Sequence, residues 1–486
     1  MQPGRRLFAH RFDLVRTGVV GEYAQPPRLF DCFSAPLSFL PNARNLTGMN
    51  DVRIKPLPEK FRFAISPPGS KSLTNRALIL SALADGPCTL SNVLFADDTN
   101  VMLDCLSKLG FDLSIDEANR SVKINGLAGA IPNKSASLFC GNSGTTIRFV
   151  SALCALGHGN YTLDGIARMR QRPIGQLTGL LTQLGARIRH LEADGFPPIE
   201  VLASGLPGGI TKFIAGQSSQ FLSAILQVAP YTRNELRVDL EGEQSSWPYV
   251  AMTMRLMDEF GHTPHLIRDP MGKPKQIIIP PGKYLPTHYT IEPDASNSSY
   301  FLAMAAINPG CSVTIEGLGK QSLQGDVGFA DLLHQMGADL LFGSDFITIR
   351  GTGDLHGIEA NLLDMPDMAQ TLAVVALFAK GETHLTGLHT LRVKETDRIA
   401  ALSNELQKFG ATIEIEGDDI TIIPPDVLQS ANIDTYDDHR MAMAFSVAGT
   451  KFNGVTIKDS HCVNKTYPTF FEDLEKLRVR IGATHL

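Results

Sequence analysis

Lys71 and Arg76 lie at the start of a predicted helix, where positive charge is unfavourable unless an anion is nearby. The stretch PPGSKSLTNRALILSALADG, Pro67–Gly86, places Ser70 and Ser72 where hydroxyl side chains cap a first helical turn. The helix dipole already makes that end positive, so Lys71 costs stability there unless it faces an anionic ligand. The stretch lacks the glycine spacing of a Walker A loop. Taken alone, it is explained equally well by a solvated basic first turn.

A second cluster, LRVKETDRIAAL, precedes another apolar helical run at Leu391–Leu402. Its charged residues are Lys394, Glu395, Asp397 and Arg398. Thr396 is available as the helix cap. By itself this cluster indicates a charged first turn with pairs such as Glu395 with Arg398.

Further polar clusters precede or interrupt apolar segments. In YDDHRMAMAF, Tyr436–Phe445, the side chain of His439 could titrate, although a single histidine is more often structural. In GNSGTTIRF, Gly141–Phe149, backbone N–H groups could approach an anion closely. RMRQRPIG supplies Arg168, Arg170 and Arg172, and NKTYP supplies Lys465.

The elements that position these residues recur with a period. A helix ending closed by glycine is predicted six times, at Gly110, Gly185, Gly261, Gly337, Gly410 and Gly482. The separations are 75, 76, 76, 73 and 72 residues. Such regularity indicates six repeated units, or two domains of three units each.

Polar helix starts recur in phase with these glycines. They are Ser70–Ser72, Asn142–Gly144, Ser218–Gln220, Asp294–Ser296, Pro366–Asp367 and Asp437–His439. If the units pack with pseudo-symmetry, the positive helix N-termini converge on one region that would attract a polyanion.

Composition limits the class of protein. The 486 residues suggest two to three domains, and 43% hydrophobic with 19% charged residues is typical of a core-forming chain. No apolar run reaches the roughly 18 residues of a membrane span. A net charge of −6 argues against a nucleic-acid-binding protein with a broad basic face.

The cysteines and the N-terminal segment add two expectations. The seven cysteines (32, 88, 105, 140, 154, 311 and 462) form no Cys-x-x-Cys pair, which favours buried thiols over zinc or disulfides. Residues 1–48 contain six arginines against three acids without sustained periodicity. A transit peptide would be richer in serine, so a disordered extension or an over-long start, with Met49 as the natural beginning, is the preferred interpretation.

Ten motifs together resemble those of the 5-enolpyruvylshikimate-3-phosphate synthase family, in the same order. They are PGSKSLTNRALIL, GNSGTTIR, RQRPIG, GQSSQFLSA, SSWPY, PDASNSSYFLA, QGD, RVKETDR, DHRMAMAF and NKTYP, spread over Phe61–Tyr467. The resemblance implies an α/β fold of two similar domains, each with three βαβαββ-type repeats (an inside-out α/β barrel), and an active site in the interdomain cleft. The implied boundaries are 49–69 plus 290–486 for the first domain and 70–289 for the second.

The activity implied by the resemblance is condensation of shikimate 3-phosphate with phosphoenolpyruvate and release of phosphate by addition and elimination, a step of chorismate and aromatic amino acid biosynthesis. The family uses no metal and no organic cofactor. The resemblance therefore implies a cytoplasmic transferase, expected to be monomeric, whose partners are these two small molecules rather than nucleic acid or membrane.

Residue by residue, the resemblance implies three sets of site residues. The catalytic set is Asp367, Glu395, Lys71 and His439. The shikimate 3-phosphate set is Lys71, Ser72, Arg76, Ser218, Ser219, Gln220, Ser246, Tyr249, Asp367, Thr390 and Lys394. The phosphoenolpyruvate set is Lys71, Asn142, Gly144, Thr145, Arg172, Gln220, Arg398, Arg440 and Lys465. Asp367 would accept the proton of the attacking hydroxyl, Glu395 would deliver one to the methylene carbon, and His439 would hold the network around Glu395.

Two departures from the family pattern and two rival functions accompany this interpretation. Thr390 stands where the family often has Asn, and Phe149 stands where it often has Pro. One rival is the sister enolpyruvyl transferase acting on a UDP-sugar, which usually carries a cysteine in a mobile loop, whereas Cys140 here is expected at a strand end. The other rival is a catalytically silent anion-binding protein of the same fold.

Overall fold

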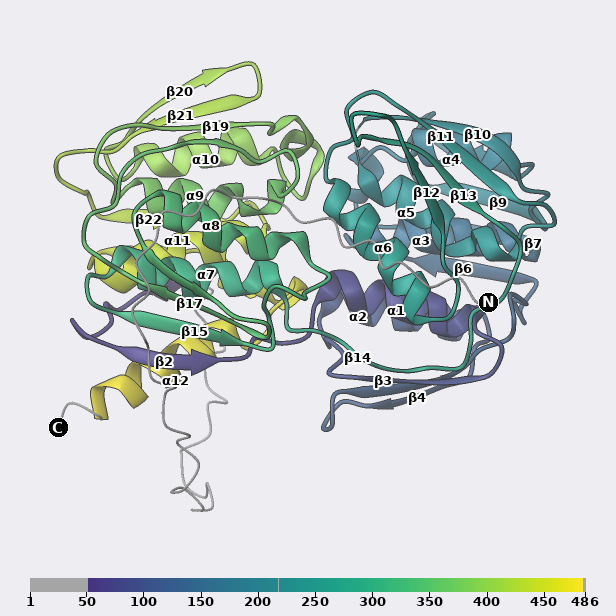
Figure 1. Cartoon of the computed structure of the whole chain (residues 1–486), viewed down its shortest axis with the longest axis horizontal. Coiled ribbons are helices and arrows are strands. Elements are labelled where there is room, and N and C mark those ends of the chain that lie inside the picture. The colour runs from purple at the N-terminus through teal and green to yellow at the C-terminus, as the bar shows by residue number, and fades with distance from the viewer. Residues whose placement is uncertain (1–50, 217, 484–486) are drawn as a thin grey trace, which may run out of the picture. The chain divides into compact units, whose positions relative to one another are not determined.

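The computed structural model describes residues 51–216 and 218–483, which belong to one compact unit, Asn50–Leu486 (Figure 1). The predicted extension, residues 1–48, lies outside the described residues, as does Cys32. The other six cysteines are buried free thiols, as expected. Within the described residues, none of the helices combines the length and apolar character needed to cross a bilayer.

Six sheets are formed by the described residues, one for each predicted unit. In spatial order, three of them are β14(His288–Thr290)-β3(Pro87–Ser91)-β5(Ser121–Asn125)-β4(Leu113–Asp116), β6(Ser135–Phe139)-β7(His158–Asp164)-β9(Ile199–Ser204)-β8(Arg187–His190) and β10(Gly209–Ile214)-β11(Leu236–Glu241)-β13(Pro274–Ile279)-β12(His265–Arg268). The other three are β16(Asp339–Phe342)-β17(Phe346–Arg350)-β15(Ser312–Glu316)-β2(Arg62–Ile65), β18(Glu359–Asn361)-β19(Thr383–Thr386)-β21(Asp419–Ile423)-β20(Thr412–Glu416) and β1(Val52–Arg53)-β23(Val455–Ile457)-β22(Ala431–Ile433).

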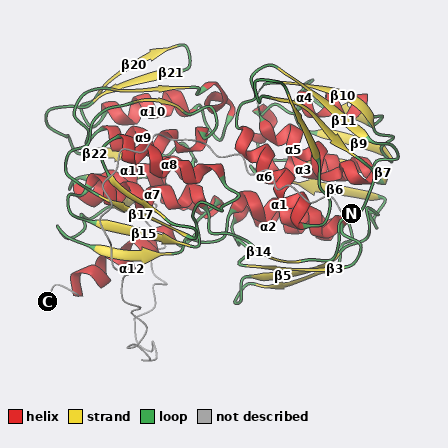
Figure 2. Cartoon of the chain, in the orientation of Figure 1, coloured by secondary structure: helices red, strands yellow, loops and turns green. Residues whose placement is uncertain are grey.

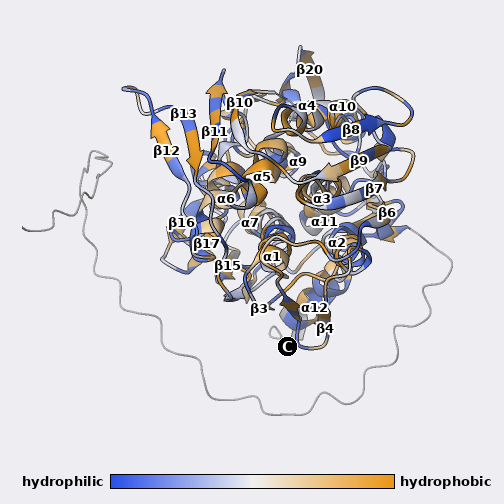
Figure 3. Ribbon diagram, turned by 90° about the vertical axis from the view of Figure 1, so that its right-hand side faces the viewer, coloured by the Kyte–Doolittle hydropathy of each residue, from blue (hydrophilic) through white to orange (hydrophobic). Residues whose placement is uncertain are grey.

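Each sheet combines one parallel pair of strands with antiparallel neighbours; β10 and β11, for example, run parallel, and β11, β13 and β12 run antiparallel. Side chains alternate between buried and more exposed along β11, as a sheet with one covered face requires. Figure 3 shows the corresponding hydrophobic and hydrophilic bands on this sheet. Parallel crossover connections in every sheet, with hairpins in the five four-stranded sheets, make this a mixed α/β fold, which confirms the expected class.

Twelve α-helices occur in the described part of the chain. They are α1(Lys71–Leu83), α2(Asp97–Lys108), α3(Gly144–Leu156), α4(Gly175–Gln183), α5(Ser219–Val228), α6(Trp247–Glu259), α7(Ala295–Ile307), α8(Phe329–Gln335), α9(Ala369–Ala376), α10(Arg398–Gln407), α11(His439–Lys451) and α12(Phe470–Ala483). Short 3₁₀ turns are η1(Met169–Gln171), η2(Ala229–Tyr231), η3(Gly325–Gly328), η4(Pro366–Met368), η5(His389–Val393) and η6(Ser460–Lys465). Figure 2 shows the helices gathered between the sheets.

Local signals explain many helix boundaries. The side chains of Ser70, Ser143, Ser218, Asp294 and Asp438 accept hydrogen bonds from first-turn N–H groups of α1, α3, α5, α7 and α11. Five of the six glycines that were predicted to end helices have positive φ, from +81° at Gly261 to +111° at Gly337. The sixth prediction was wrong, because α12 continues through Gly482. Asp397, not Thr396, caps α10, since its carboxylate reaches two backbone N–H groups.

Buried apolar side chains form two clusters. The first core draws on Ile54–Phe61 and Ala295–Leu477, and the second core on Leu73–Ile291. The chain passes between them twice, and the two passages are hydrogen bonded: Ser70 N–H donates to Glu292 O (2.8 Å) and Asp294 N–H to Pro68 O (2.9 Å). The polar starts of several helices lie where the two cores meet.

Candidate active site

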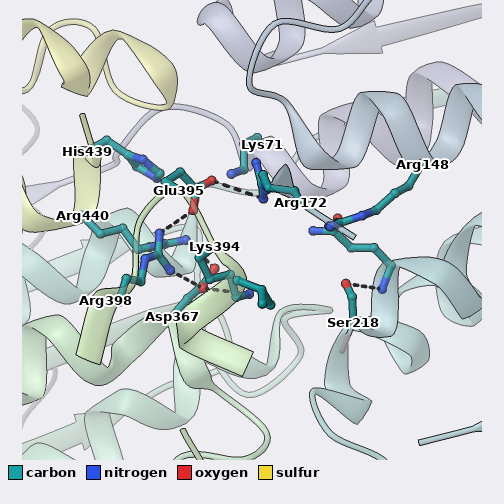
Figure 4. A pocket seen from close by; sticks show the side chains of 12 residues that line it. Lys71, Arg148, Arg172, Ser218, Asp367, Lys394, Glu395, Arg398, His439 and Arg440 are labelled. Atoms are coloured by element: carbon teal, nitrogen blue, oxygen red, sulfur yellow. Dashed lines mark hydrogen bonds and ion pairs between the residues drawn. The ribbon is translucent and has the colours of Figure 1, made fainter. Parts of the chain in front are cut away.

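Most of the candidate site residues that the sequence indicated line a cavity between the two cores (Figure 4). Its lining consists of Lys71, Arg148, Arg172, Ser218, Gln220, Asp367, Val393, Lys394, Glu395, Arg398, His439 and Arg440. Six of these side chains are cationic and two are carboxylates. Such an excess of positive charge in a partly enclosed space fits a ligand that carries several negative charges.

Helix starts from both cores supply this lining. Lys71 is the first residue of α1, and Gln220 lies in the first turn of α5. From the first core, Arg398 begins α10, while His439 and Arg440 begin α11. The expected convergence is present for four of the six predicted helix starts, since Asn142–Gly144 and Asp294–Ser296 line neither this cavity nor the adjoining one. The dipoles of the helices that converge add to the positive potential of the side chains.

Asp367 is held by cations on both carboxylate oxygens. Oδ1 lies 3.0 Å from Nη1 of Arg398 and 3.5 Å from Nζ of Lys394, and Oδ2 lies 2.7 Å from Nη2 of Arg440. Burial alone would raise the pKa of this carboxyl, but the surrounding cations, Arg440 foremost, hold the pKa well below its usual range. Asp367 is therefore ionised, which is the form in which a carboxylate can accept a proton.

Glu395 lies in a similar network across the cavity. Its Oε2 accepts a hydrogen bond from Nη2 of Arg398 at 2.9 Å, and its Oε1 lies 3.8 Å from Arg172 and 3.9 Å from Lys465. Burial opposes ionisation, yet Arg172 and Arg398 outweigh it and keep the pKa of Glu395 well below its usual range. An anionic ligand that neutralised these cations would raise that pKa and allow Glu395 to carry a proton.

His439 is enclosed and neutral. Its ring is almost fully buried, and burial together with the nearby Arg440 lowers its pKa well below the usual value. Neither ring nitrogen has a hydrogen-bond partner among the described residues. His439 Nδ1 lies 3.5 Å from Asp438 Oδ1, so the ring packs beside the buried pair of Asp438 with Arg398.

A second cavity adjoins the first and shares part of its lining. It is lined by Lys71, Ser72, Arg76, Ser218, Ser219, Gln220, Ser246, Tyr249, Asp367, Thr390 and Lys394, the eleven residues named from the resemblance for shikimate 3-phosphate. The Thr390 hydroxyl is buried and has no hydrogen-bond partner among the described residues, so it is available to a ligand. The hydroxyl-rich wall and the cations of this cavity suit a phosphorylated polyol.

Arg76 is held mainly by protein groups. Its guanidinium donates to Thr253 Oγ1 at 2.7 Å, to Ser72 O at 2.9 Å and to Ser223 Oγ at 3.2 Å. The ring of Phe149, the residue that departs from the family pattern, lies 5.2 Å from the guanidinium carbon. Burial lowers the pKa of Arg76 to about 10, which leaves it charged at neutral pH.

Four residues expected at phosphoenolpyruvate do not line either cavity. Asn142 and Lys465 line a neighbouring cavity, and the Asn142 carbonyl accepts hydrogen bonds from Arg172 Nη1 and Lys465 Nζ, each at 2.8 Å. Gly144 lies directly against Arg172, since a Cβ there would come within 2.7 Å of Nη2. Thr145 is buried behind this loop and accepts a hydrogen bond from Asn75. The loop thus positions Arg172 and Lys465.

Two buried charged residues escaped the sequence reasoning. Asp98 lies in the first turn of α2, and its carboxylate contacts Lys465 Nζ at 2.7 Å and Lys71 Nζ at 3.3 Å. Acids at helix N-termini are common for helix stability alone, so nothing in the sequence singled out Asp98. Arg148 lines the first cavity and donates to Gln220 Oε1 at 2.5 Å, and its burial, with Arg172 nearby, lowers its pKa to about 9.

The described residues contain no group of three or more His, Cys, Asp or Glu side chains arranged to hold a metal ion. The chemistry available from the side chains that are present is binding of anions and movement of protons. Asp367 and Glu395 are the carboxylates suited to the latter.

Comparison with known proteins places the chain in a family. The family model described as EPSP synthase (3-phosphoshikimate 1-carboxyvinyltransferase) matches residues 58–474. The 3-phosphoshikimate 1-carboxyvinyltransferase of Shewanella piezotolerans is 44% identical over 432 residues, covering 88% of this chain and 100% of that protein. Its counterpart in Shewanella oneidensis is 44% identical over 437 residues, covering 89% and 100%.

A solved structure agrees with the sequence relatives. The EPSP synthase of Acinetobacter baumannii superposes with a TM-score of 0.73 at 27% identity, covering 89% of this chain and 98% of that one. The region matched by the family model, residues 58–474, includes the whole second core and every residue of the two cavities. The chain therefore belongs to the EPSP synthase family.

Proposed function

We propose that the chain transfers the enolpyruvyl group of phosphoenolpyruvate to the 5-hydroxyl of shikimate 3-phosphate and releases inorganic phosphate. The observation that carries this proposal is the pair of adjoining cavities: six cations face two carboxylates in the first, and hydroxyls and cations line the second. Both substrates carry phosphate and carboxylate groups, which such linings bind. The enzyme acts in the cytoplasm, as a monomer, in the pathway to chorismate and the aromatic amino acids.

Shikimate 3-phosphate occupies the second cavity. Ser218, Ser219 and Ser246 donate hydrogen bonds to its phosphate, and Lys394 and Thr390 hold ring oxygens. Ser246 is fixed for this role by a left-handed backbone (φ +54°), and its N–H donates to Leu363 O at 2.8 Å. The 5-hydroxyl of shikimate 3-phosphate then faces Asp367, which lines both cavities.

Phosphoenolpyruvate occupies the first cavity. Arg172, Arg398 and Arg440 clamp its charged groups, with Lys465 reaching from behind the glycine loop. Lys71 lies between the two substrates because its side chain lines both cavities. Charge on phosphoenolpyruvate neutralises the cations that now hold the pKa of Glu395 low, so the pKa of Glu395 rises on binding.

The proton transfers follow from this placement. In the addition, the 5-oxygen of shikimate 3-phosphate bonds to C2 of phosphoenolpyruvate, its proton passes to Asp367, and Glu395 protonates C3, which becomes a methyl group. In the elimination, Glu395 recovers a proton from that methyl group, the C2–C3 double bond re-forms and the bond from C2 to the phosphate oxygen breaks. The phosphate takes up the proton held by Asp367, and both carboxylates return to their starting state.

Two domains meet at this site in the proposal. Residues 49–69 and 290–486 form the first and residues 70–289 the second. The two separate hydrophobic cores support this division apart from Ile291, which is buried in the second core. Each substrate would contact both domains, since each cavity is lined from both cores.

A phosphate-release assay tests the proposal. Purified protein given both substrates is expected to release one phosphate per enolpyruvyl shikimate 3-phosphate formed, with neither substrate sufficient alone. A parallel reaction replaces shikimate 3-phosphate with a UDP-sugar acceptor. Release with the UDP-sugar only would establish the sister activity, and no release with either acceptor would leave a silent anion-binding protein.

A further inference from the structure

Arg168 contacts the catalytic segment without lining either cavity. Its Nε donates to the carbonyl oxygen of Glu395 at 3.0 Å, and its Nη2 donates to the carbonyl oxygen of Lys394 at 2.9 Å. The third nitrogen, Nη1, donates to Gln171 Oε1 at 3.2 Å within its own segment. Arg168 therefore holds two consecutive main-chain carbonyls while remaining outside the space available to substrates.

These hydrogen bonds connect the two cores. Arg168 directly precedes η1, where Met169 is buried in the second core. Lys394 and Glu395 follow η5, where Leu391 is buried in the first core. The donor and its acceptors are separated by 227 and 226 residues along the chain, so the contact exists only while the two cores are together.

The two residues whose carbonyls Arg168 binds, Lys394 and Glu395, also supply side chains to the proposed mechanism. Lys394 Nζ lies 3.5 Å from Asp367, and Glu395 is the proposed proton donor. A planar guanidinium that binds two successive carbonyls fixes both peptide planes, and thus the direction in which each Cα–Cβ bond leaves the backbone. Arg172, four residues after Arg168, approaches the Glu395 side chain from the same segment.

We propose that Arg168 is a positioning residue that makes alignment of Lys394 and Glu395 depend on contact between the two cores. This inference rests on the proposed function, since it assigns Arg168 to that reaction. When the cores separate, the carbonyls of Lys394 and Glu395 lose both donors and the peptide turns freely. When a substrate brings the cores together, Arg168 restores the orientation in which Glu395 reaches the methylene carbon.

Arg170 offers a matched control two residues away. It donates to Asp164 Oδ2 at 2.6 Å and to Glu192 Oε1 at 2.7 Å, both within the second core's own segments. Replacing Arg170 removes the same charge and a similar number of hydrogen bonds, but none that reaches the catalytic peptide.

The test compares Arg168→Ala, Arg168→Lys and Arg170→Ala with the wild-type protein in the phosphate-release assay. A shift of about 1 Å in Glu395 is expected to lower kcat on the order of 10²-fold in Arg168→Ala. Lysine has a single nitrogen to share between two carbonyls, so Arg168→Lys is expected to recover only part of that loss. Arg170→Ala should keep kcat within about twofold, as an exposed ion pair contributes little.

A binding measurement separates positioning from general damage. Trp247, the single tryptophan of the chain, directly follows Ser246, which lines the shikimate 3-phosphate cavity. Its fluorescence is therefore the signal used to measure binding of that substrate. In Arg168→Ala the dissociation constant is expected to change far less than kcat, and millimolar guanidinium should restore part of kcat. An equal loss in binding and kcat, or kcat as high as in Arg170→Ala, would overturn the inference while leaving the proposed function intact. An inactive wild-type protein would overturn the proposed function, and this inference with it.

Discussion

Asp98 allows the electrostatics of the site to be tested without reference to turnover. Its carboxylate is almost fully buried and is paired with Lys71 and Lys465. Asp98→Asn keeps the shape but leaves two ammonium groups without their counter-ion. Breaking a buried pair in this way typically costs about 3–5 kcal/mol, and we expect the lower value because Lys465 retains its bond to the Asn142 carbonyl.

The same substitution should strengthen anion binding. One negative charge fewer beside the cations favours a bound phosphate by on the order of 1–2 kcal/mol at an effective dielectric constant near 20, or roughly tenfold in affinity. Phosphate at about 100 times its wild-type dissociation constant stabilises the wild-type protein by about 2.7 kcal/mol, and a tenfold tighter variant by about 4.1 kcal/mol. Phosphate should thus close roughly a third to a half of the gap in unfolding free energy between Asp98→Asn and the wild-type protein.

Urea unfolding with and without inorganic phosphate measures both effects. Asp104→Asn is the control, since Asp104 lies on the same helix α2 but pairs with Lys108 where both side chains are about half exposed. Such a pair is worth about 0–1 kcal/mol. The reasoning is refuted if Asp98→Asn destabilises no more than Asp104→Asn, or if phosphate stabilises Asp98→Asn and the wild-type protein equally.

Three further predictions follow from the site. Glu395→Gln and Asp367→Asn each remove a proton-transfer group while keeping shape, so kcat in the phosphate-release assay should fall by about 10²–10⁴; wild-type turnover in either variant would remove that residue from the mechanism. Gly144→Ala places a methyl group 2.7 Å from Nη2 of Arg172, so KM for phosphoenolpyruvate should rise while KM for shikimate 3-phosphate changes little; an equal rise in both would contradict this. Burial, with Asp367 nearby, raises the pKa of Asp326 to about 6, so this group's contribution to stability is present below about pH 4 and lost as the pH rises through 6. Urea unfolding should therefore show Asp326→Asn gaining stability relative to the wild-type protein across that range, and a constant difference would count against the raised pKa.

Local features of the fold were predictable because their causes are local. Serine and aspartate side chains cap unpaired N–H groups within the first helical turn, and the left-handed conformation at a helix end favours glycine. Both signals are therefore visible in a short stretch of sequence. Gly337, with φ +111°, ends α8 as expected. Gly482 carries the same local pattern, yet α12 continues through it, so the pattern alone does not end a helix.

The contacts that sequence reasoning missed join residues over long sequence separations. Lys465 pairs with Asp98 across 367 residues, and Arg168 reaches Glu395 across 227. Arg148 is the single charged residue of helix α3, where its charge carried no local signal. Contacts of this kind depend on how the two cores meet, and no periodicity within one repeat encodes that.

The two hydrogen-bonded passages of the chain limit how the cores can move. Pro68–Ser70 and Glu292–Asp294 run side by side, joined by two backbone hydrogen bonds and an antiparallel bridge between Gly69 and Pro293. A paired ribbon of this kind bends across its width but resists twisting and sliding, since both would break its hydrogen bonds. Rotation of one core against the other is thereby reduced to one main degree of freedom. Arg168 and the carbonyls that it contacts should consequently meet in the same register each time the cores come together, without a search over other orientations.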